Sequence, residues 1–193
     1  MDGERSSATQ WLLERERRGV ASAEALDFFD AQPPARIADC LGRWRGGGLH
    51  TGHPMDGLLE ALGWYGKEML DAERVHPLLF QGRDGAVFPL NPALMPVSLA
   101  QLAPGLAQGR GIQAAFAVSR RLLRTSRPKA RLRMMEHRGV VTAAMIYDDL
   151  PICDLFRRID RNTLLGVMDL RGMERPFFFT LRREEPDSSG QRE

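Results

Sequence analysis

Carboxylates and a phenol gather in the second half of the chain, where they could carry acid/base chemistry. The candidates are Tyr147, Asp148, Asp149, Asp154 and Asp169. A tyrosine near several carboxylates can serve as general acid and base toward a bound substrate. Asp148 and Asp149 also precede Pro151, and an aspartate ahead of a helical proline caps the helix by accepting its free backbone N–H groups. We expect capping, with Arg157 and Arg158 at the far end of that helix, where they suit its dipole.

Lys67 is one of two lysines in the chain. If its side chain faces an interior it needs an anionic partner, because an unpaired buried ammonium is costly, and a ligand carboxylate or phosphate would fit. If it faces outward, it pairs with Glu68 or with an acid on the next strand. The sequence leaves both arrangements open.

Two histidines, His50 and His53, lie three positions apart in a glycine-rich segment and could ligate a metal or haem. This segment has no cysteine, and no carboxylate follows the two histidines before Asp56, so the usual set of ligands is incomplete. We therefore expect no metal and no cofactor, with a haem-binding barrel as an alternative. His76 and His137 are isolated and are expected to be structural or exposed.

Nucleophilic catalysis has little support. The two cysteines, Cys40 and Cys153, form no Cys-x-x-Cys pair and are expected to be buried free thiols. A Gly-x-Ser-x-Gly elbow, a phosphate loop and a dinucleotide fingerprint are all missing from the sequence. An enzyme built on this chain would use acid/base chemistry.

The net charge is +2, yet positions 110–138 carry nine basic residues against one acid, Glu136. Such a block is usually a solvated face, and its functional alternative is a site for anionic groups. Phe116 is its one aromatic and no nucleic-acid-binding motif accompanies it, so we expect no nucleic-acid partner. A further alternative is an interaction module whose basic helix, 110–127, docks on an acidic protein or an anionic membrane.

Hydropathy patterns place these residues in an α+β protein with a mainly antiparallel sheet. Helices are expected at 8–18, 22–32, 55–62, 112–123 and 151–158, and strands around Trp44 and at 64–69, 75–80, 86–90, 129–134, 140–147, 163–170 and 177–182. Without a βαβ rhythm, such a sheet buries one face and loses its edges by curving strongly or closing into a barrel.

The N-terminus is polar, and no apolar run reaches the roughly 18 residues of a membrane-spanning helix. We expect a cytoplasmic protein without integral membrane association, for which transient contact with an anionic membrane stays open. The sequence does not indicate the oligomeric state.

Several stretches are more specific than these patterns. They are GRWRGGGLHTGHPMDGLLEALGWYGKEM (42–69), VHPLLF (75–80), RPKARLR (127–133), RGVVTAAMIYDDLPICDLFRRID (138–160) and TLLGVMDLRG (163–172). In this order they resemble a family of small bacterial and fungal proteins that pair a GXWXG domain with a DUF4334 domain. The resemblance runs from about Ile37 to Arg183 and implies a lipocalin-like or fatty-acid-binding-like barrel that holds an apolar ligand. Leu155 departs from it, because the family often has histidine there.

The expected organisation is a helical segment (1–35), a GXWXG-like part (36–105), a DUF4334-like part (106–183) that shares one barrel with it, and a disordered tail (184–193). The leading hypothesis is a non-catalytic barrel that binds a hydrophobic molecule with an anionic head, a fatty acid or a phospholipid. The alternative is a cytosolic isomerase, lyase or hydrolase that acts on a small apolar substrate in the same cavity.

The expected ligand-binding residues are Trp44, Trp64, Tyr65, Lys67, Leu132, Arg133, Met134, Met145, Tyr147 and Phe178. Trp44 should be chiefly structural, its ring covered by an arginine. One of Trp64 and Tyr65 should face the interior. On the alternating strand 129–134, the apolar residues should face inward, and Arg133 is expected to reach an anionic group at the cavity mouth.

Overall fold

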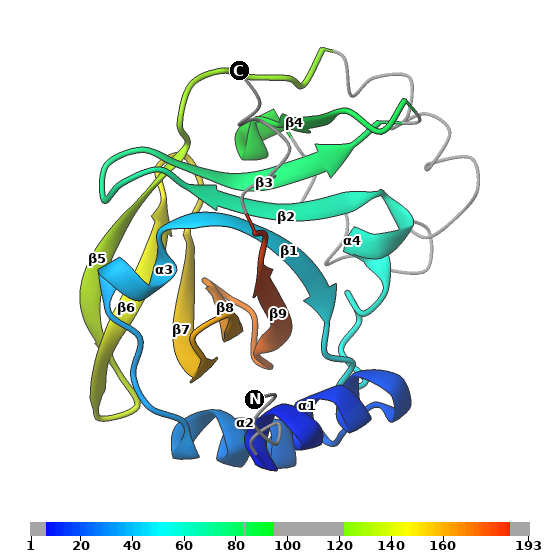
Figure 1. Ribbon diagram of the computed structural model, residues 1–193, viewed down its shortest axis with the longest axis vertical. Helices are drawn as coiled ribbons and strands as arrows, with labels where there is room; N and C mark the ends of the chain where they lie inside the picture. Colours follow the sequence, from blue (N-terminus) through cyan, green and yellow to red (C-terminus); the bar gives the residue numbers. More distant parts are fainter. Residues whose placement is uncertain (1–6, 83, 95–121, 186–193) are drawn as a thin grey trace, which may run out of the picture.

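The computed structural model describes residues 7–82, 84–94 and 122–185, whose strands form one antiparallel sheet closed into a barrel (Figure 1). The ring follows the order β2-β1-β9-β8-β7-β6-β5-β3, and pairing between β2 and β3 closes it. Its strands are β1 (Gly42–Gly48), β2 (Trp64–Met69), β3 (Val75–Gln81), β5 (Ala130–His137), β6 (Val140–Tyr147), β7 (Ile152–Asp160), β8 (Thr163–Leu170) and β9 (Phe177–Arg183), and β4 (Val87–Pro89) extends the sheet from β3. The expected antiparallel α+β barrel is confirmed.

Strand alternation divides the buried side chains into two cores, one on each face of the wall. The interior core includes Trp44, Phe156 and Phe179, and the outer core includes Leu155 and Phe178. The outer core is covered by α1 (Ser7–Arg18) and α2 (Ser22–Ala31), which lie side by side across one side of the barrel in Figure 1. The shorter helices are α3 (Ile37–Cys40), α4 (Leu58–Ala61) and the 3-10 turn η1 (Pro92–Leu94).

The wall contains a short insert between β6 and β7. These two strands pair at three positions, from Ala144 opposite Leu155 to Ile146 opposite Cys153. Beyond them, residues 33–35 fill the gap: the backbone N–H of Arg158 donates to the Pro33 carbonyl (2.9 Å), and that of Ala143 donates to the Ala35 carbonyl (2.8 Å). The N-terminal segment is therefore part of the barrel wall.

One expected helix is wrong. Residues 151–158 do not form a helix but lie in β7, where Ile152 and Phe156 face the interior and Leu155 faces the outer core. A strand between two apolar surfaces explains the difference, because both faces of 152–157 are buried and Pro151 only precedes the strand. With no helix here, Asp148 and Asp149 cap nothing, and Arg157 and Arg158 have no helix dipole to complement.

Other expectations are only partly matched. The helix expected at 55–62 shrinks to α4, and the one expected at 112–123 lies almost wholly outside the described residues. The tail expected from residue 184 begins with a placed residue, since the backbone N–H of Glu184 donates to the Arg43 carbonyl (2.9 Å). Residues 186–193 lie outside the description. No helix within the described ranges has the length and apolar character needed to cross a bilayer.

Candidate functional site in the barrel interior

The barrel interior holds an ion pair between Lys67 of β2 and Asp154 of β7. The Lys67 Nζ lies 2.8 Å from Asp154 Oδ2, and the two side chains are 3% and 1% exposed. The same ammonium donates to the carbonyl of Pro77 (3.1 Å) and to the phenol oxygen of Tyr147 (3.3 Å). We call Lys67, Asp154 and Tyr147 the interior cluster.

An irregularity between β2 and β3 turns Lys67 inward. Trp64 and Lys67 are three positions apart and would point to opposite faces of a regular strand. The register with β3 shifts on both sides of Gly66, so both side chains face the interior. Pro77 lies opposite the second shift and has no backbone N–H to continue the ladder. A Cβ on Gly66 would lie 1.9 Å from the Trp44 carbonyl oxygen, so only glycine fits there.

Aromatic rings surround the buried ammonium. The Lys67 Nζ lies 4.9 Å from the ring centroid of Phe179 and 5.7 Å from those of Trp64 and Tyr147. Ring faces attract a cation, and these contacts offset part of its desolvation. Glycines on the neighbouring strands leave room for the rings, because a Cβ at Gly46 would lie 2.2 Å from the Trp64 ring, and one at Gly166 would lie 2.3 Å from the Phe179 ring.

Hydrogen bonding within the interior cluster is uneven. Asp154 Oδ2 accepts from Lys67 and from the Tyr147 hydroxyl (3.4 Å), whereas Asp154 Oδ1 is buried without a partner among the described residues. Burial lowers the pKa of Lys67 and raises that of Asp154, and their mutual attraction opposes both shifts. Burial also raises the pKa of Tyr147 well above its ordinary value, so the phenol stays protonated.

Six of the ten expected ligand-binding residues face the interior. They are Trp44, Trp64, Lys67, Leu132, Met145 and Tyr147. The expected inward side of 129–134 is confirmed by Ala130 and Leu132, and of the pair 64–65 it is Trp64 that faces the interior. Trp44 donates its indole N–H to the Cys40 carbonyl (2.7 Å), with the Arg183 guanidinium 4.2 Å over its ring.

The other four lie elsewhere. Tyr65 is on the outer face, where it donates to Glu184 and the Arg45 guanidinium lies 4.8 Å over its ring. Phe178 packs in the outer core, and Met134 is 43% exposed.

Arg133 also lies on the outer face and reaches no interior group. It pairs with Glu73 (2.9 Å), so its expected place at a cavity mouth is wrong. The side-chain period of two explains this, since Leu132 faces inward and its neighbour must face out. On the same outer surface, Arg131 pairs with Asp148 (3.6 Å) and Lys129 with Asp149 (2.9 Å). These pairs account for the two aspartates and for part of the basic block as a solvated face.

Two family models match this chain. Residues 27–85 match the GXWXG protein family, and residues 128–183 match a domain of unknown function, DUF4334. The chain thus carries, in this order, a match to each of the two domains whose family the sequence resembles. A crystal structure of a protein from Thermomonospora curvata is similar, with 29% identity, a TM-score of 0.68, and coverage of 92% of this chain and 99% of that one. No curated protein matches.

Leu155, where the resemblance leads us to expect histidine, lies on the opposite face of the barrel wall from the interior cluster. Leu155 is 1% exposed and packs in the outer core beneath the N-terminal helices. Its neighbour Asp154 faces the opposite way, into the barrel. The leucine therefore does not contact the interior cluster from inside the barrel.

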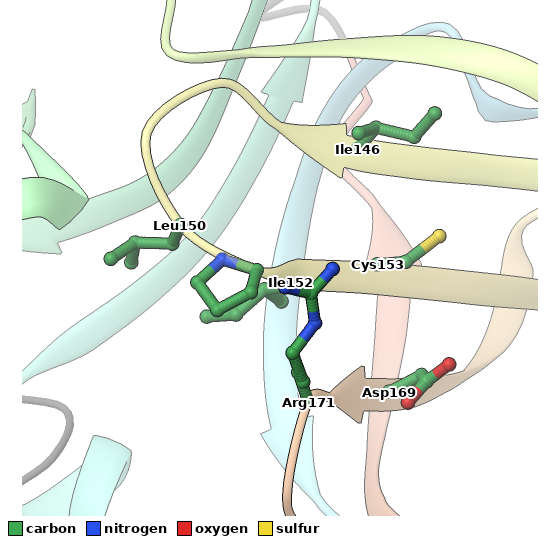
Figure 2. A pocket seen from close by; sticks show the side chains of 7 residues that line it. Ile146, Leu150, Ile152, Cys153, Asp169 and Arg171 are labelled. Atoms are coloured by element: carbon green, nitrogen blue, oxygen red, sulfur yellow. The ribbon is translucent and has the colours of Figure 1, made fainter.

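The sequence predicts Asp154 as a candidate for acid/base chemistry but not as a ligand-binding residue, and it predicts a helix where the structure has β7. The signal was the alternation Ile152, Asp154, Phe156, which places one acid in an apolar row. Asp169, the other downstream acid, lies on the opposite face of the wall. It lines an outer hollow of about 410 Å³ with Cys153 of β7 and with Arg171, which directly follows β8 (Figure 2).

Histidine and cysteine chemistry has no centre in the described part of the chain. His50 lies 3.6 Å from Glu60, and His53 accepts from the backbone N–H of Met55 (3.1 Å). No three His, Cys, Asp or Glu side chains of the described ranges gather as metal ligands. Burial raises the pKa of both thiols, Cys40 and Cys153, to about 12, so they stay protonated and poorly nucleophilic.

Proposed function

We propose that the barrel binds a hydrophobic small molecule of the fatty-acid class, with its polar head at the interior cluster. The observation that carries the proposal is a buried charged group in an otherwise apolar interior, with Asp154 Oδ1 unpartnered among the described side chains. Polar groups that are buried without a partner are costly and mark places where a ligand or water completes the bonding.

Residual exposure supports the same location. Trp64, Leu78 and Met168 are each 8% exposed and Tyr147 is 6% exposed, whereas Trp44 is fully buried. Leu78 follows the Pro77 carbonyl that accepts from Lys67, and Met168 pairs with Asp154 across the sheet. Solvent-sized space thus reaches the side chains around the interior cluster, where an acyl chain would gain about 0.8 kcal/mol per buried CH₂.

A fatty acid suits the interior cluster better than a phospholipid. The three side chains offer one free oxygen among side chains of at most 8% exposure, which suits a single small head group. A phospholipid carries a phosphodiester and a glycerol backbone that would have to share this space.

Adjacent residues on opposite faces of β2 give the test. Protein purified from bacterial cells is examined by native mass spectrometry for co-purified lipid and titrated at pH 5, where a large share of the acid keeps its proton, with a fluorescent fatty acid at micromolar concentration. Trp64→Leu should change the affinity at least tenfold, and Tyr65→Leu, the matched outer variant, should leave it unchanged. A protein that purifies empty and binds no probe would refute the proposal, as would equal effects of the two variants.

An acid/base enzyme is the second candidate, favoured by the burial of Asp154. The carboxylate faces the interior beside the protonated phenol of Tyr147, an arrangement that could serve as general base and acid toward an apolar substrate. Mass spectrometry of the compound released after incubation separates the candidates, since a binding protein returns its ligand unchanged. The haem alternative gains nothing, because His50 and His53 are engaged by Glu60 and by the Met55 backbone.

A further inference from the structure

We infer that the ligand's head group is a hydrogen-bond donor to Asp154 Oδ1, a hydroxyl or a protonated carboxyl, rather than an anion held by Lys67. The inference rests on the proposed function and narrows the class of ligand. It reverses the simplest view of a buried lysine in a lipid barrel, which would make the ammonium the anchor for a carboxylate.

Lys67 has no proton left for a ligand. An ammonium has three N–H donors. In this structure they are taken by Asp154 Oδ2 at 2.8 Å, the Pro77 carbonyl at 3.1 Å and the Tyr147 phenol oxygen at 3.3 Å. A ligand carboxylate would have to displace one of these acceptors, and the nearest of them already carries the compensating charge.

Tyr147 and Arg183 are committed as well. The Tyr147 hydroxyl donates to Asp154 Oδ2 (3.4 Å). The Arg183 guanidinium, over the ring of Trp44, donates to the carbonyls of Leu41 and Asp39. The Tyr147 hydroxyl therefore has no O–H left for an anionic head, and the Arg183 guanidinium is held at Trp44 by three hydrogen bonds to backbone carbonyls, the third to Arg161 (3.4 Å).

Two polar atoms of the interior remain for a head group: the acceptor Asp154 Oδ1 and the donor N–H of the Trp64 indole, which has no partner among the described residues and could bond the oxygen of the same hydroxyl. Asp154 Oδ1 is buried and accepts from no described residue. The proton of the Lys67–Asp154 pair lies along the contact with Oδ2, so Oδ1 stays an acceptor whether that proton resides on nitrogen or on oxygen. A ligand hydroxyl would donate the hydrogen bond that this oxygen lacks, whereas a ligand carboxylate would place a second negative charge beside it in a desolvated interior.

The chemistry identifies two heads, an alcohol and a neutral carboxylic acid. An alcohol has the same donor at every pH near neutrality. A fatty acid has this donor only in its protonated form, and its carboxyl ionises in water with a pKa of about 4 to 5. The affinity for the acid should therefore fall about tenfold for each pH unit above that value, and the affinity for the alcohol should not change.

The experiment compares dodecan-1-ol, dodecanoic acid and methyl dodecanoate as competitors of Nile red, an uncharged probe, at pH 6, 7 and 8. We expect the alcohol to bind at least tenfold more tightly than the ester at every pH, and the acid to weaken about tenfold per pH unit. An acid that binds as tightly as the alcohol at pH 8 would overturn the inference. If none of the three competes, the proposed function itself fails.

Asp154→Asn adds a second measurement, because the amide keeps its oxygen for Lys67 and presents an N–H₂ donor where Oδ1 lay. The variant should reverse the preference, with the ester gaining at least tenfold on the alcohol. Asp169→Asn makes the same change on the outer face of the wall and should leave all three affinities unchanged. The pH series on the unchanged protein tests the inference even where Asp154→Asn does not fold.

Discussion

The ammonium of Lys67 and the carboxylate of Asp154, 87 positions apart in the chain, lie 2.8 Å apart in the barrel interior. Lys67 belongs to the part of the chain that matches the GXWXG family, and Asp154 to the part that matches DUF4334. Each of these two buried charges is therefore neutralised by a residue from the other matched part, across the barrel from β2 to β7.

Removing one partner of this pair should cost more than removing both. Lys67→Met leaves a buried carboxylate without its counter-charge, which we expect to lower the free energy of unfolding by about 3–5 kcal/mol. The double variant Lys67→Met/Asp154→Leu should recover most of this loss. Urea denaturation of the single and double variants measures the loss of unfolding free energy and its recovery.

Arg43 and Glu68 provide the control, because they pair at 2.8 Å on the outer surface with 44% and 20% exposure. Arg43→Met should cost less than about 1 kcal/mol, as exposed pairs do. A double variant at the interior pair that is no more stable than Lys67→Met would show that the losses come from packing and not from the unpaired charge.

Trp44→Ala should destabilise the barrel by about 3–5 kcal/mol, because the indole is fully buried and its loss leaves a cavity. The variant also loses the hydrogen bond to the Cys40 carbonyl. Thermal and urea unfolding measure the effect. A variant that keeps its melting temperature and loses only ligand binding would assign Trp44 to the ligand instead of the core.

Gly66→Ala should prevent folding, since its Cβ would collide with the backbone carbonyl of Trp44 and the β1–β2 pairing cannot form around it. Gly172→Ala is the control. That glycine also has a positive φ, +83°, but nothing lies within 4 Å of the added Cβ, so the cost should stay near about 1 kcal/mol. Soluble yield and circular dichroism distinguish the two, and a stable Gly66→Ala protein would contradict the close approach of β1 and β2.

Acidification below pH 6.5 should destabilise the protein through its histidines. Burial lowers the pKa of His53, His76 and His137 in the folded state. The unfolded chain therefore takes up protons first as the pH falls through about 6.5, and stability is lost from there down to the folded pKa values, by at most about 1.4 kcal/mol per pH unit for each histidine.

Melting temperatures at pH 7.5 and 5.5 test this dependence. His53→Asn keeps an acceptor for the Met55 N–H without a titrating ring, so its melting temperature should fall less on acidification than that of the unchanged protein. If the melting temperatures of the variant and of the unchanged protein fall equally on acidification, His53 does not contribute to the pH dependence.

Replacing Arg157 should stabilise the protein. Its side chain is 1% exposed on the outer face of β7, and none of its guanidinium nitrogens has a hydrogen-bond partner in the ranges that the structure covers. The Phe29 ring, 5.1 Å away, compensates only in part. Arg157→Met keeps much of the volume and removes an unpaired buried charge, so unfolding should cost about 1–3 kcal/mol more. Arg158→Met, at an exposed position, should have no effect, and a destabilised Arg157→Met would contradict the prediction.

The strands that could be predicted are those with a local signal. The alternation in 129–134 predicts which side of β5 faces inward, and Ala130 and Leu132 lie on that side. The barrel followed from the number of strands and the absence of a βαβ rhythm.

The interior cluster could not be predicted in full, because its geometry depends on distant pairings. Lys67 faces inward through a register shift that involves Pro77 on another strand, and nothing local to 64–69 reveals it. Asp154 lay in a segment whose proline and acids imitate a helix start. Only the assembled sheet shows that both faces of this segment are buried.

The ring of strands joins the two matched parts into one closed barrel. β1, β2 and β3 come from the first matched part and β5 to β9 from the second, and the ring joins them at β1–β9 and at β3–β5. Alone, each part would be an open sheet with two bare edges, and each pair of edges is the complement of the other. Neither part can close a barrel by itself, so the two family models describe halves of a single folding unit.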